Sequence, residues 1–131
     1  RLKKDGIVIV QSGSASISEN DVFTSIYHTL NKVFPHVFPY VTYIPSYALP
    51  WGFCMATHNP SNLDIPGEEI DARINAKITG NLRFYDSITH HSLFNLPKYL
   101  RTDIQRQRRI IQDKDPLMEH YPGISVESTT P

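Results

Sequence analysis

The stretch HVFPYVTYIPSYALPWGFCMATH, residues 36–58, decides the fold because it reads as two strands separated by a very short loop. Residues 36–44 and 51–58 are rich in apolar, β-branched and aromatic side chains, which is typical of strands. The loop between them is too short for the crossover helix that joins parallel neighbours, so we predict an antiparallel pair. Pro39 lies inside the first of these strands and cannot donate to a ladder, which predicts an edge position or a bulge.

Two further elements precede this hairpin. GIVIVQ, residues 6–11, is a continuous apolar run of the kind found in parallel sheets, where a strand is buried on both faces. Residues 19–33 have helical periodicity, with Ser18 as the expected N-cap and Pro35 beyond the end. The order strand, helix, strand, loop, strand predicts an α/β fold. We expect the C-terminal half of a Rossmann-like (class I methyltransferase-like) sheet, with one parallel strand and a terminal antiparallel hairpin.

Helices are expected after the sheet. Residues 68–78 carry isoleucines at a spacing of four, a pattern that predicts a short helix ending near Gly80. Residues 81–86 read as extended, and residues 90–107 as helical turns that break at Pro97 and then resume. We expect residues 1–112 to form the C-terminal part of the Rossmann-like domain and residues 113–131 to be a loosely held tail.

Composition limits the possible classes of function. The 131 residues suit one small domain, and 13 basic residues balance 13 acidic ones, so nothing favours nucleic acid or a membrane surface. The single cysteine excludes an intrachain disulfide and favours a reducing, cytoplasmic setting. No run is long enough to span a bilayer, and no signal peptide opens the chain.

The chain starts without Met on what reads as a helix end at Gly6, so we expect it to be the C-terminal part of a longer protein.

Two polar side chains follow predicted strands, where ligands of open α/β sheets bind. Gln11 comes directly after the apolar run, and its amide offers both a donor and an acceptor. The alternative is a Gly/Ser turn whose glutamine caps the sheet, and the residues alone favour it. Tyr47 either lines a pocket with its hydroxyl or covers the end of the sheet. Trp51 has the same two interpretations, and the residues favour a packing role over a role in a pocket.

Further residues that could carry chemistry have simpler explanations. Adjacent histidines on a helix point apart, so His90 and His91 predict a structural or exposed role and not a metal site. Cys54 lies within an apolar strand and is expected to be a small buried side chain. The basic cluster of residues 106–109 is typical of a solvated helix end, where the helix dipole favours cations. No metal cofactor is therefore expected.

Three segments, taken in order, resemble the polyamine aminopropyltransferase (spermidine synthase) family. They are DGIVIVQSGS (residues 5–14), VFPHVFPYVTYIPSYALPWGF (residues 33–53) and GNLRFYDSITHHSLFNLPKYLR (residues 80–101). The resemblance implies transfer of an aminopropyl group from decarboxylated S-adenosylmethionine to an amine such as putrescine, giving spermidine and methylthioadenosine. It also implies a homodimer or tetramer, and Leu93, Phe94 and Leu96 are candidates for that interface.

The resemblance assigns roles to residues of this chain. It implies that Gln11 binds substrate and that Tyr47 contacts the acceptor amine as a catalytic residue. Trp51 and Phe53 match positions near the acceptor channel. The family's main catalytic aspartate and its glycine-rich cofactor loop are expected upstream of this chain, so the isolated chain should be inactive.

The loop after Tyr47 departs from the spermidine synthase pattern. Tyr47 is followed by Ala48, Leu49, Pro50, Trp51 and Gly52, so the loop is one residue shorter and lacks the usual glycine before Trp51, which is closer to thermospermine-synthase-like members. Putrescine, agmatine and spermidine therefore all stay open as acceptors. Two different classes of protein also stay open: a Rossmann-like methyltransferase, and a non-catalytic module that keeps the fold without the site.

Overall fold

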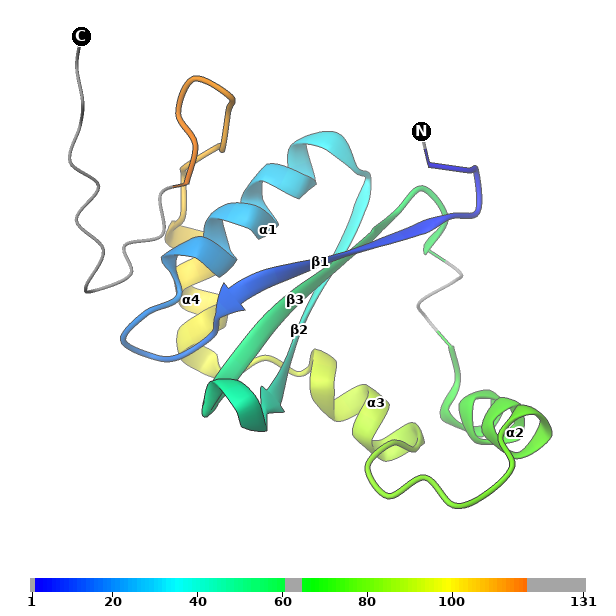
Figure 1. The fold of residues 1–131 in the computed structure, drawn as a ribbon. Helices are drawn as coiled ribbons and strands as arrows, with labels where there is room; N and C mark the ends of the chain where they lie inside the picture. Colours follow the sequence, from blue (N-terminus) through cyan, green and yellow to red (C-terminus); the bar gives the residue numbers. More distant parts are fainter. Residues whose placement is uncertain (1, 61–64, 118–131) are drawn as a thin grey trace, which may run out of the picture.

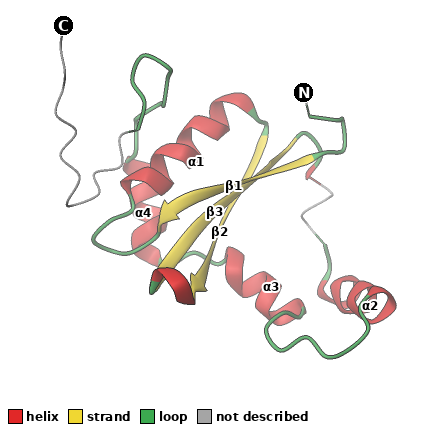
Figure 2. Ribbon diagram, in the orientation of Figure 1, coloured by secondary structure: helices red, strands yellow, loops and turns green. Residues whose placement is uncertain are grey.

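The computed structural model describes residues 2–60 and 65–117. Within these residues, a three-stranded sheet separates two groups of helices (Figure 1). The strands lie in the order β1-β3-β2. Figure 2 shows α1 and α4 on one side of the sheet, and α3 and α2 on the other. The elements are β1 (Ile7–Ser14), α1 (Asp21–Val33), β2 (His36–Ile44), the short 3₁₀ helix η1 (Pro45–Tyr47), β3 (Leu49–Thr57), α2 (Gly67–Lys77), α3 (Ser87–Phe94) and α4 (Lys98–Arg106).

The predicted hairpin is confirmed. β2 and β3 pair antiparallel from His36 opposite Thr57 to Ile44 opposite Leu49, and η1 joins them. Pro39 lies in β2, which is an edge strand of the described sheet, as its missing N–H predicted. The α/β class is also confirmed by this mixture of sheet and helices.

β1 differs from its prediction in two respects. It pairs with β3 in the antiparallel sense, and no parallel pairing occurs among the described residues. β1 and β2 do run in the same direction, but β3 lies between them. The prediction that both faces of β1 are buried is wrong for the described structure, since Ile7 and Ile9 are 39% and 54% exposed. An apolar run alone does not reveal how many faces are covered.

Two local predictions are also corrected. Helix α1 begins at Asp21 with Asn20 at the N-cap position, whereas Ser18 contacts Ser16 through its hydroxyl. The side chain of Asn20 makes no capping bond, and its amide instead donates to the carbonyl of Ser16 and to Asp103. Residues 81–86, expected to be extended, form no strand in the structure. The helices that follow, α3 and α4, are separated at Pro97 as predicted.

Alternation along the strands gives the sheet two distinct faces. Gln11 lies opposite Phe53, and Phe53 lies opposite Tyr40, so these three side chains share one face. Cys54 points to the other face, where it joins the buried cluster with Phe23 of α1. That cluster also contains Ala15, Leu96 and Leu100. Leu96 is only 6% exposed, so it belongs to the core of its own chain, and the interface suggested for it is wrong.

Gly52 permits the closest approach between α1 and the sheet. A Cβ atom built at this position would lie 2.5 Å from a ring carbon of Phe23. Only glycine can leave that space to the phenyl ring, because real Cβ atoms do not approach a ring so closely. The pair therefore sets how tightly α1 packs behind the strand that carries Trp51 and Phe53.

A carboxylate attaches α2 to α3. Asp71 accepts hydrogen bonds from the backbone N–H and the hydroxyl of Ser87, at 3.0 and 2.6 Å. Asp86 caps α3 by accepting from the backbone N–H of Thr89 at 2.7 Å. These bonds fix the first turn of α3, the helix that carries His90 and His91.

The segment after α4 returns to α1. The backbone N–H of Ile111 donates to the hydroxyl of Thr29 at 3.0 Å, and Arg109 pairs with Asp115 at 2.9 Å. Residues 118–131, most of the predicted tail, lie outside the described residues, so the boundary at residue 112 stays a prediction. Across the two described stretches, every helix is too short or too polar to cross a bilayer.

Candidate functional site

The structure brings together the three residues that the sequence nominated. The side-chain amide of Gln11 donates to the hydroxyl of Tyr47 at 3.4 Å, across 36 residues of sequence. The rings of Tyr47 and Trp51 lie 4.3 Å apart between centroids, tilted by 39°. The three side chains therefore form a single cluster at the end of β1 and of the β2–β3 hairpin.

An irregularity in β1 places Gln11 in this cluster. Gln11 lies opposite Phe53, but the next paired residue, Ser14, lies opposite Trp51, so the register shifts between them. Gly13 within this shift has a φ of +88°, which favours glycine. Such bulges bend a strand and redirect its side chains, and here the bend lies directly beside Gln11.

A left-handed residue closes the loop that carries Tyr47. Ala48 has a φ of 53°, and its N–H donates to the carbonyl of Pro45 at 3.2 Å. This conformation costs an alanine about 1 kcal/mol, because its Cβ approaches the backbone. Pro45 begins η1 with a fixed φ, so the loop has few ways to move Tyr47 away from Gln11.

The cluster is accessible and offers hydrogen-bonding groups. Gln11 is exposed and Tyr47 is 44% exposed, whereas Trp51 is half-buried. Because Gln11 uses its NH₂ group toward Tyr47, its carbonyl oxygen can accept from a ligand. The buried indole N–H of Trp51 has no hydrogen-bond partner among the described residues. Trp51 therefore supplies an apolar wall, and Gln11 and Tyr47 supply the polar groups.

Sequence reasoning did not connect the cluster to a second set of rings on the same face. Tyr40 stacks on Phe53 at 5.1 Å between centroids, and Phe94 of α3 lies 5.4 Å from Tyr40. The period-two pattern of β2 could have placed Tyr40 on the face of Phe53. Nothing in the sequence indicated that Phe94 comes from α3 onto that face.

The two histidines of α3 lie at the end of this second set. The hydroxyl of Tyr85 and Nδ1 of His90 are 2.7 Å apart, and the rings of His90 and His91 meet edge to face. Burial lowers the pKa of His90, and the nearby His91 lowers it further. Within residues 2–60 and 65–117, no three His, Cys, Asp or Glu side chains gather in a way that could hold a metal ion.

Cys54 is a buried core residue, as predicted. Its side chain is fully buried, and burial raises the pKa of its thiol to about 11 despite a hydrogen bond with Ser12. A protonated, inaccessible thiol is a poor nucleophile and a poor metal ligand.

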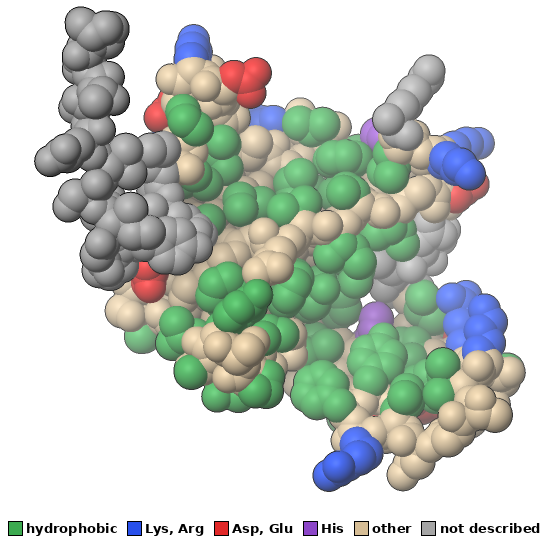
Figure 3. Space-filling view, viewed as in Figure 1, with side chains coloured by type: hydrophobic (Ala, Val, Ile, Leu, Met, Phe, Trp, Pro, Cys, Tyr) green, Lys and Arg blue, Asp and Glu red, His purple; other side chains and the backbone are tan. Residues whose placement is uncertain are grey.

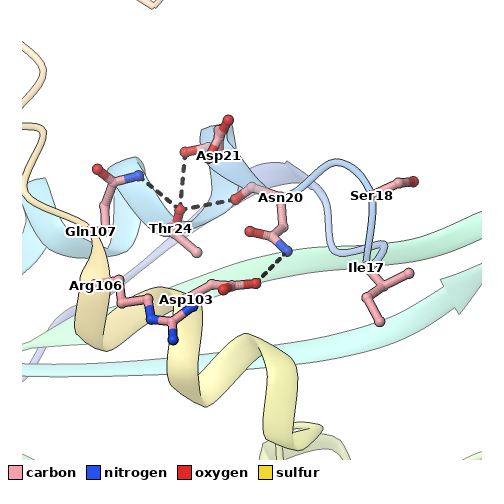
Figure 4. Close-up of a pocket in the computed structure, with 8 residues that line it drawn as sticks. All are labelled: Ile17, Ser18, Asn20, Asp21, Thr24, Asp103, Arg106 and Gln107. Carbon is pink, nitrogen blue, oxygen red and sulfur yellow. Dashed lines mark hydrogen bonds between the residues drawn. The ribbon is translucent and has the colours of Figure 1, made fainter.

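A separate pocket lies between the start of α1 and the end of α4, and Figure 4 shows its lining. Its volume is about 370 Å³, and none of the predicted site residues borders it. Several of its polar side chains bond one another: Asn20 donates to Asp103 at 3.0 Å, and Gln107 donates to Thr24 at 3.0 Å. Arg106, from the predicted basic cluster, borders the same pocket. These contacts join α4 to α1, so we assign the pocket a structural role.

Comparison with known proteins identifies the family. The model of the spermine/spermidine synthase domain matches residues 1–65. A polyamine aminopropyltransferase of Sulfolobus acidocaldarius is 40% identical over 115 residues, which cover 86% of this chain and 37% of that protein. A thermospermine synthase of Arabidopsis thaliana is 29% identical over 126 residues, which cover 95% of this chain and 37% of that protein. The chain thus spans little more than a third of the length of these curated relatives.

Solved structures share the fold. Spermidine synthase from Thermotoga maritima matches with a TM-score of 0.65 at 20% identity, over 81% of this chain and 36% of that chain. A spermidine synthase crystallised with the transition-state analogue AdoDATO matches with a TM-score of 0.64 at 22% identity, over 81% of this chain and 35% of that chain. Sequence similarity and shared fold agree, and the chain belongs to the spermine/spermidine synthase family, the polyamine aminopropyltransferases.

Proposed function

We propose that the protein carrying this chain transfers an aminopropyl group from decarboxylated S-adenosylmethionine to an amine acceptor. The observation that carries the proposal is the cluster of Gln11, Tyr47 and Trp51, formed by residues far apart in sequence. These are the residues to which the family resemblance assigns the acceptor side of the reaction. The curated relatives named as polyamine aminopropyltransferases support the same reaction class.

The reaction is a direct displacement. The acceptor nitrogen forms a bond to the carbon next to the sulfonium, the carbon–sulfur bond breaks, and its electron pair stays on sulfur as a neutral thioether. An amine is mostly protonated near pH 7, so it must lose a proton before it can attack. The site must therefore bind an ammonium group, assist its deprotonation and align the neutral amine with the leaving group.

The described residues can perform the binding and aligning steps. The carbonyl oxygen of Gln11 and a lone pair of the Tyr47 hydroxyl can accept N–H groups of the acceptor, and the two side chains already meet at 3.4 Å through the amide nitrogen of Gln11. The Trp51 ring, packed against Tyr47, limits where the acceptor can lie. We assign Tyr47 and Gln11 to the acceptor nitrogen, and we expect the main general base and the sulfonium side to come from sequence outside this chain.

We also propose that the protein acts in the cytoplasm, as the single buried cysteine favours, and that it forms a homodimer or tetramer as the family resemblance implies. The acceptor is proposed as putrescine, agmatine or spermidine. Sedimentation of the complete protein would test the assembly.

Product analysis tests the proposed reaction. The complete protein is incubated with decarboxylated S-adenosylmethionine and each of the three amines, and methylthioadenosine is measured. Release with at least one amine is the expected result. Absence of methylthioadenosine with all three would contradict the proposal. In a parallel incubation with S-adenosylmethionine, formation of S-adenosylhomocysteine would instead show methyl transfer.

A further inference from the structure

A tyrosine of α4 holds the segment that follows β1. The hydroxyl of Tyr99 donates to the backbone carbonyl of Ala15 at 2.6 Å, although 84 residues separate them. Ala15 is fully buried, so water cannot replace the hydroxyl while the segment keeps its position. Within residues 2–60 and 65–117, no other donor bonds this carbonyl. Because a buried carbonyl without a donor is costly, the contact ties Ala15 to α4.

The sheet holds Ala15 from its other side. The N–H of Ala15 donates at 2.9 Å to the carbonyl of Pro50, the residue before Trp51. Ala15 is therefore clamped between α4 and the strand that carries Trp51. The bulge around Gly13 lies directly before this clamp, and Gln11 lies directly before the bulge. A bulge interrupts the ladder, so the shape of this segment depends on how firmly its two ends are fixed.

Tyr99 lies on the opposite face of the sheet from the candidate site. It packs against the buried cluster that contains Cys54, whereas Gln11 shares the other face with Phe53. Figure 2 likewise shows α4 and α3 on different sides of the sheet. Figure 3 shows hydrophobic side chains gathered over the sheet and over the α3 region, and such side chains offer no donor to a buried carbonyl. Tyr99 therefore acts on Gln11 through the backbone and does not touch a ligand there.

Two further contacts make α4 a rigid support for Tyr99. Asn20 donates to Asp103 and Gln107 donates to Thr24, both at 3.0 Å, and these bonds fasten α4 to α1 (Figure 4). Burial, and to a smaller extent the charge of Asp103, raise the pKa of Tyr99. Its hydroxyl therefore keeps its proton throughout the neutral range and stays a donor to the carbonyl.

We propose that Tyr99 is a positioning residue for the acceptor side of the site: by fixing the carbonyl of Ala15 it sets the bulge at Gly13, and the bulge directs the Gln11 amide toward Tyr47. This inference rests on the proposed function. Without the hydroxyl, the segment between Gln11 and Ala15 gains freedom, and the carbonyl oxygen of Gln11 meets the amine less often in the correct geometry. The sulfonium side, expected from sequence outside this chain, is not affected.

Tyr99→Phe in the complete protein tests the proposal, because it removes the hydroxyl and keeps the ring. KM is measured for decarboxylated S-adenosylmethionine and for the amine that releases the most methylthioadenosine. We expect the KM for the amine to rise about threefold to thirtyfold, because small misplacements of a binding group are costly, and the KM for the donor to stay unchanged. A smaller fraction of folded protein would lower the apparent kcat but would change neither KM.

Hydrogen exchange gives a readout that does not depend on activity. In Tyr99→Phe, the backbone amides of residues 12–16 should exchange about twofold to tenfold faster, because the bond from Ala15 to Pro50 opens more often. The amides of β2, which lie away from this segment, should keep their exchange rates.

Tyr27→Phe and Thr24→Val are the matched controls. Tyr27 packs against the same buried cluster, and its hydroxyl forms no hydrogen bond in the described part of the chain, so Tyr27→Phe should change neither KM. Thr24→Val removes the hydroxyl that accepts from Gln107, which loosens α4 without removing the bond to Ala15. It should lower the free energy of unfolding and leave the KM for the amine unchanged.

The outcomes separate the two proposals. If the unmodified protein releases no methylthioadenosine with any amine, the proposed function fails, and the positioning role falls with it. If transfer occurs but Tyr99→Phe leaves the KM for the amine unchanged, or raises both KM values alike, the proposed function stands and the positioning role is overturned. Unchanged exchange of residues 12–16, or an equal rise in KM for Thr24→Val, would overturn the positioning role in the same way.

Discussion

The amide of Gln11 on β1 reaches the hydroxyl of Tyr47 on the β2–β3 hairpin at 3.4 Å, although 36 residues separate them. The distance is at the long end for a hydrogen bond, and both side chains are exposed, so the contact itself contributes little to stability. Its importance is geometric, since it places two hydrogen-bonding groups where one ligand nitrogen can meet both.

Changing Tyr47→Phe should lower activity without unfolding the protein. The ring and its contact with Trp51 stay, and only the hydroxyl that meets Gln11 is lost. We expect kcat/KM for aminopropyl transfer to fall about 10- to 100-fold, the scale of losing one positioning and proton-transfer contact, with the melting temperature unchanged. Tyr43→Phe removes a hydroxyl from the same hairpin away from the cluster and is the control. Equal activities of the two variants would show that Tyr47 has been wrongly assigned.

Gly52→Ala should be strongly destabilising. The new Cβ would lie 2.5 Å from a ring carbon of the fully buried Phe23, and neither the strand nor the ring can move freely. We expect a loss of about 1–3 kcal/mol in the free energy of unfolding, measured by urea denaturation.

A double variant identifies the cause of that loss. Adding Phe23→Leu to Gly52→Ala should recover part of it, because the smaller side chain makes room for the Cβ. Gly80 has a φ of +108° and open space around it, so Gly80→Ala should be destabilising through backbone strain and should not be rescued by Phe23→Leu. Additive effects of Gly52→Ala and Phe23→Leu would contradict the steric explanation.

Cys54 should make stability fall at high pH. Burial raises the pKa of its thiol from 9.0 to about 11 in the folded chain. The unfolded chain therefore loses this proton first, so the stabilisation is complete below pH 9 and is lost as the pH rises to about 11. The loss should be about 2 kcal/mol.

The measurement for Cys54 is a series of urea denaturations between about pH 8 and about pH 11. Cys54→Ala should flatten this part of the profile, even if its stability at the lowest pH of the series is reduced. Burial also raises the pKa values of Tyr40, Tyr85 and Tyr99, and these remain in both proteins. Cys54 also raises the pKa of Tyr40, so the difference between the two profiles reports the thiol together with its effect on that tyrosine. Parallel profiles would show that Cys54 ionises as readily in the folded chain as in the unfolded one.

Asp103→Ala should weaken the joint between α4 and α1. The carboxylate accepts from the amide of Asn20, which is only 8% exposed, so its removal leaves a buried donor with one partner fewer. We expect a loss of about 1–3 kcal/mol in the free energy of unfolding. Asp113→Ala removes an exposed carboxylate from the same part of the chain and should cost much less. Similar losses for both variants would mean that the loss reflects overall charge and not the Asn20 contact.

The sequence alone determined the elements whose signals are local. The span of β2, its edge position at Pro39 and its antiparallel pairing with β3 follow from residue type, a missing N–H and a short loop. The burial of Cys54 follows from its place in an apolar strand. The nomination of Gln11, Tyr47 and Trp51 came from strand ends and from family resemblance.

Only the tertiary structure decided how those elements meet. Placement of β3 between β1 and β2 depends on pairing between distant segments, which an apolar run does not encode. The contact of Gln11 with Tyr47 needs both that pairing and the bulge before Ser14. The second set of rings, from Phe53 to Phe94, needs α3 to pack across the sheet, a long-range contact that no local pattern specifies. Local chemistry thus selected the candidate residues, and long-range packing turned them into a site.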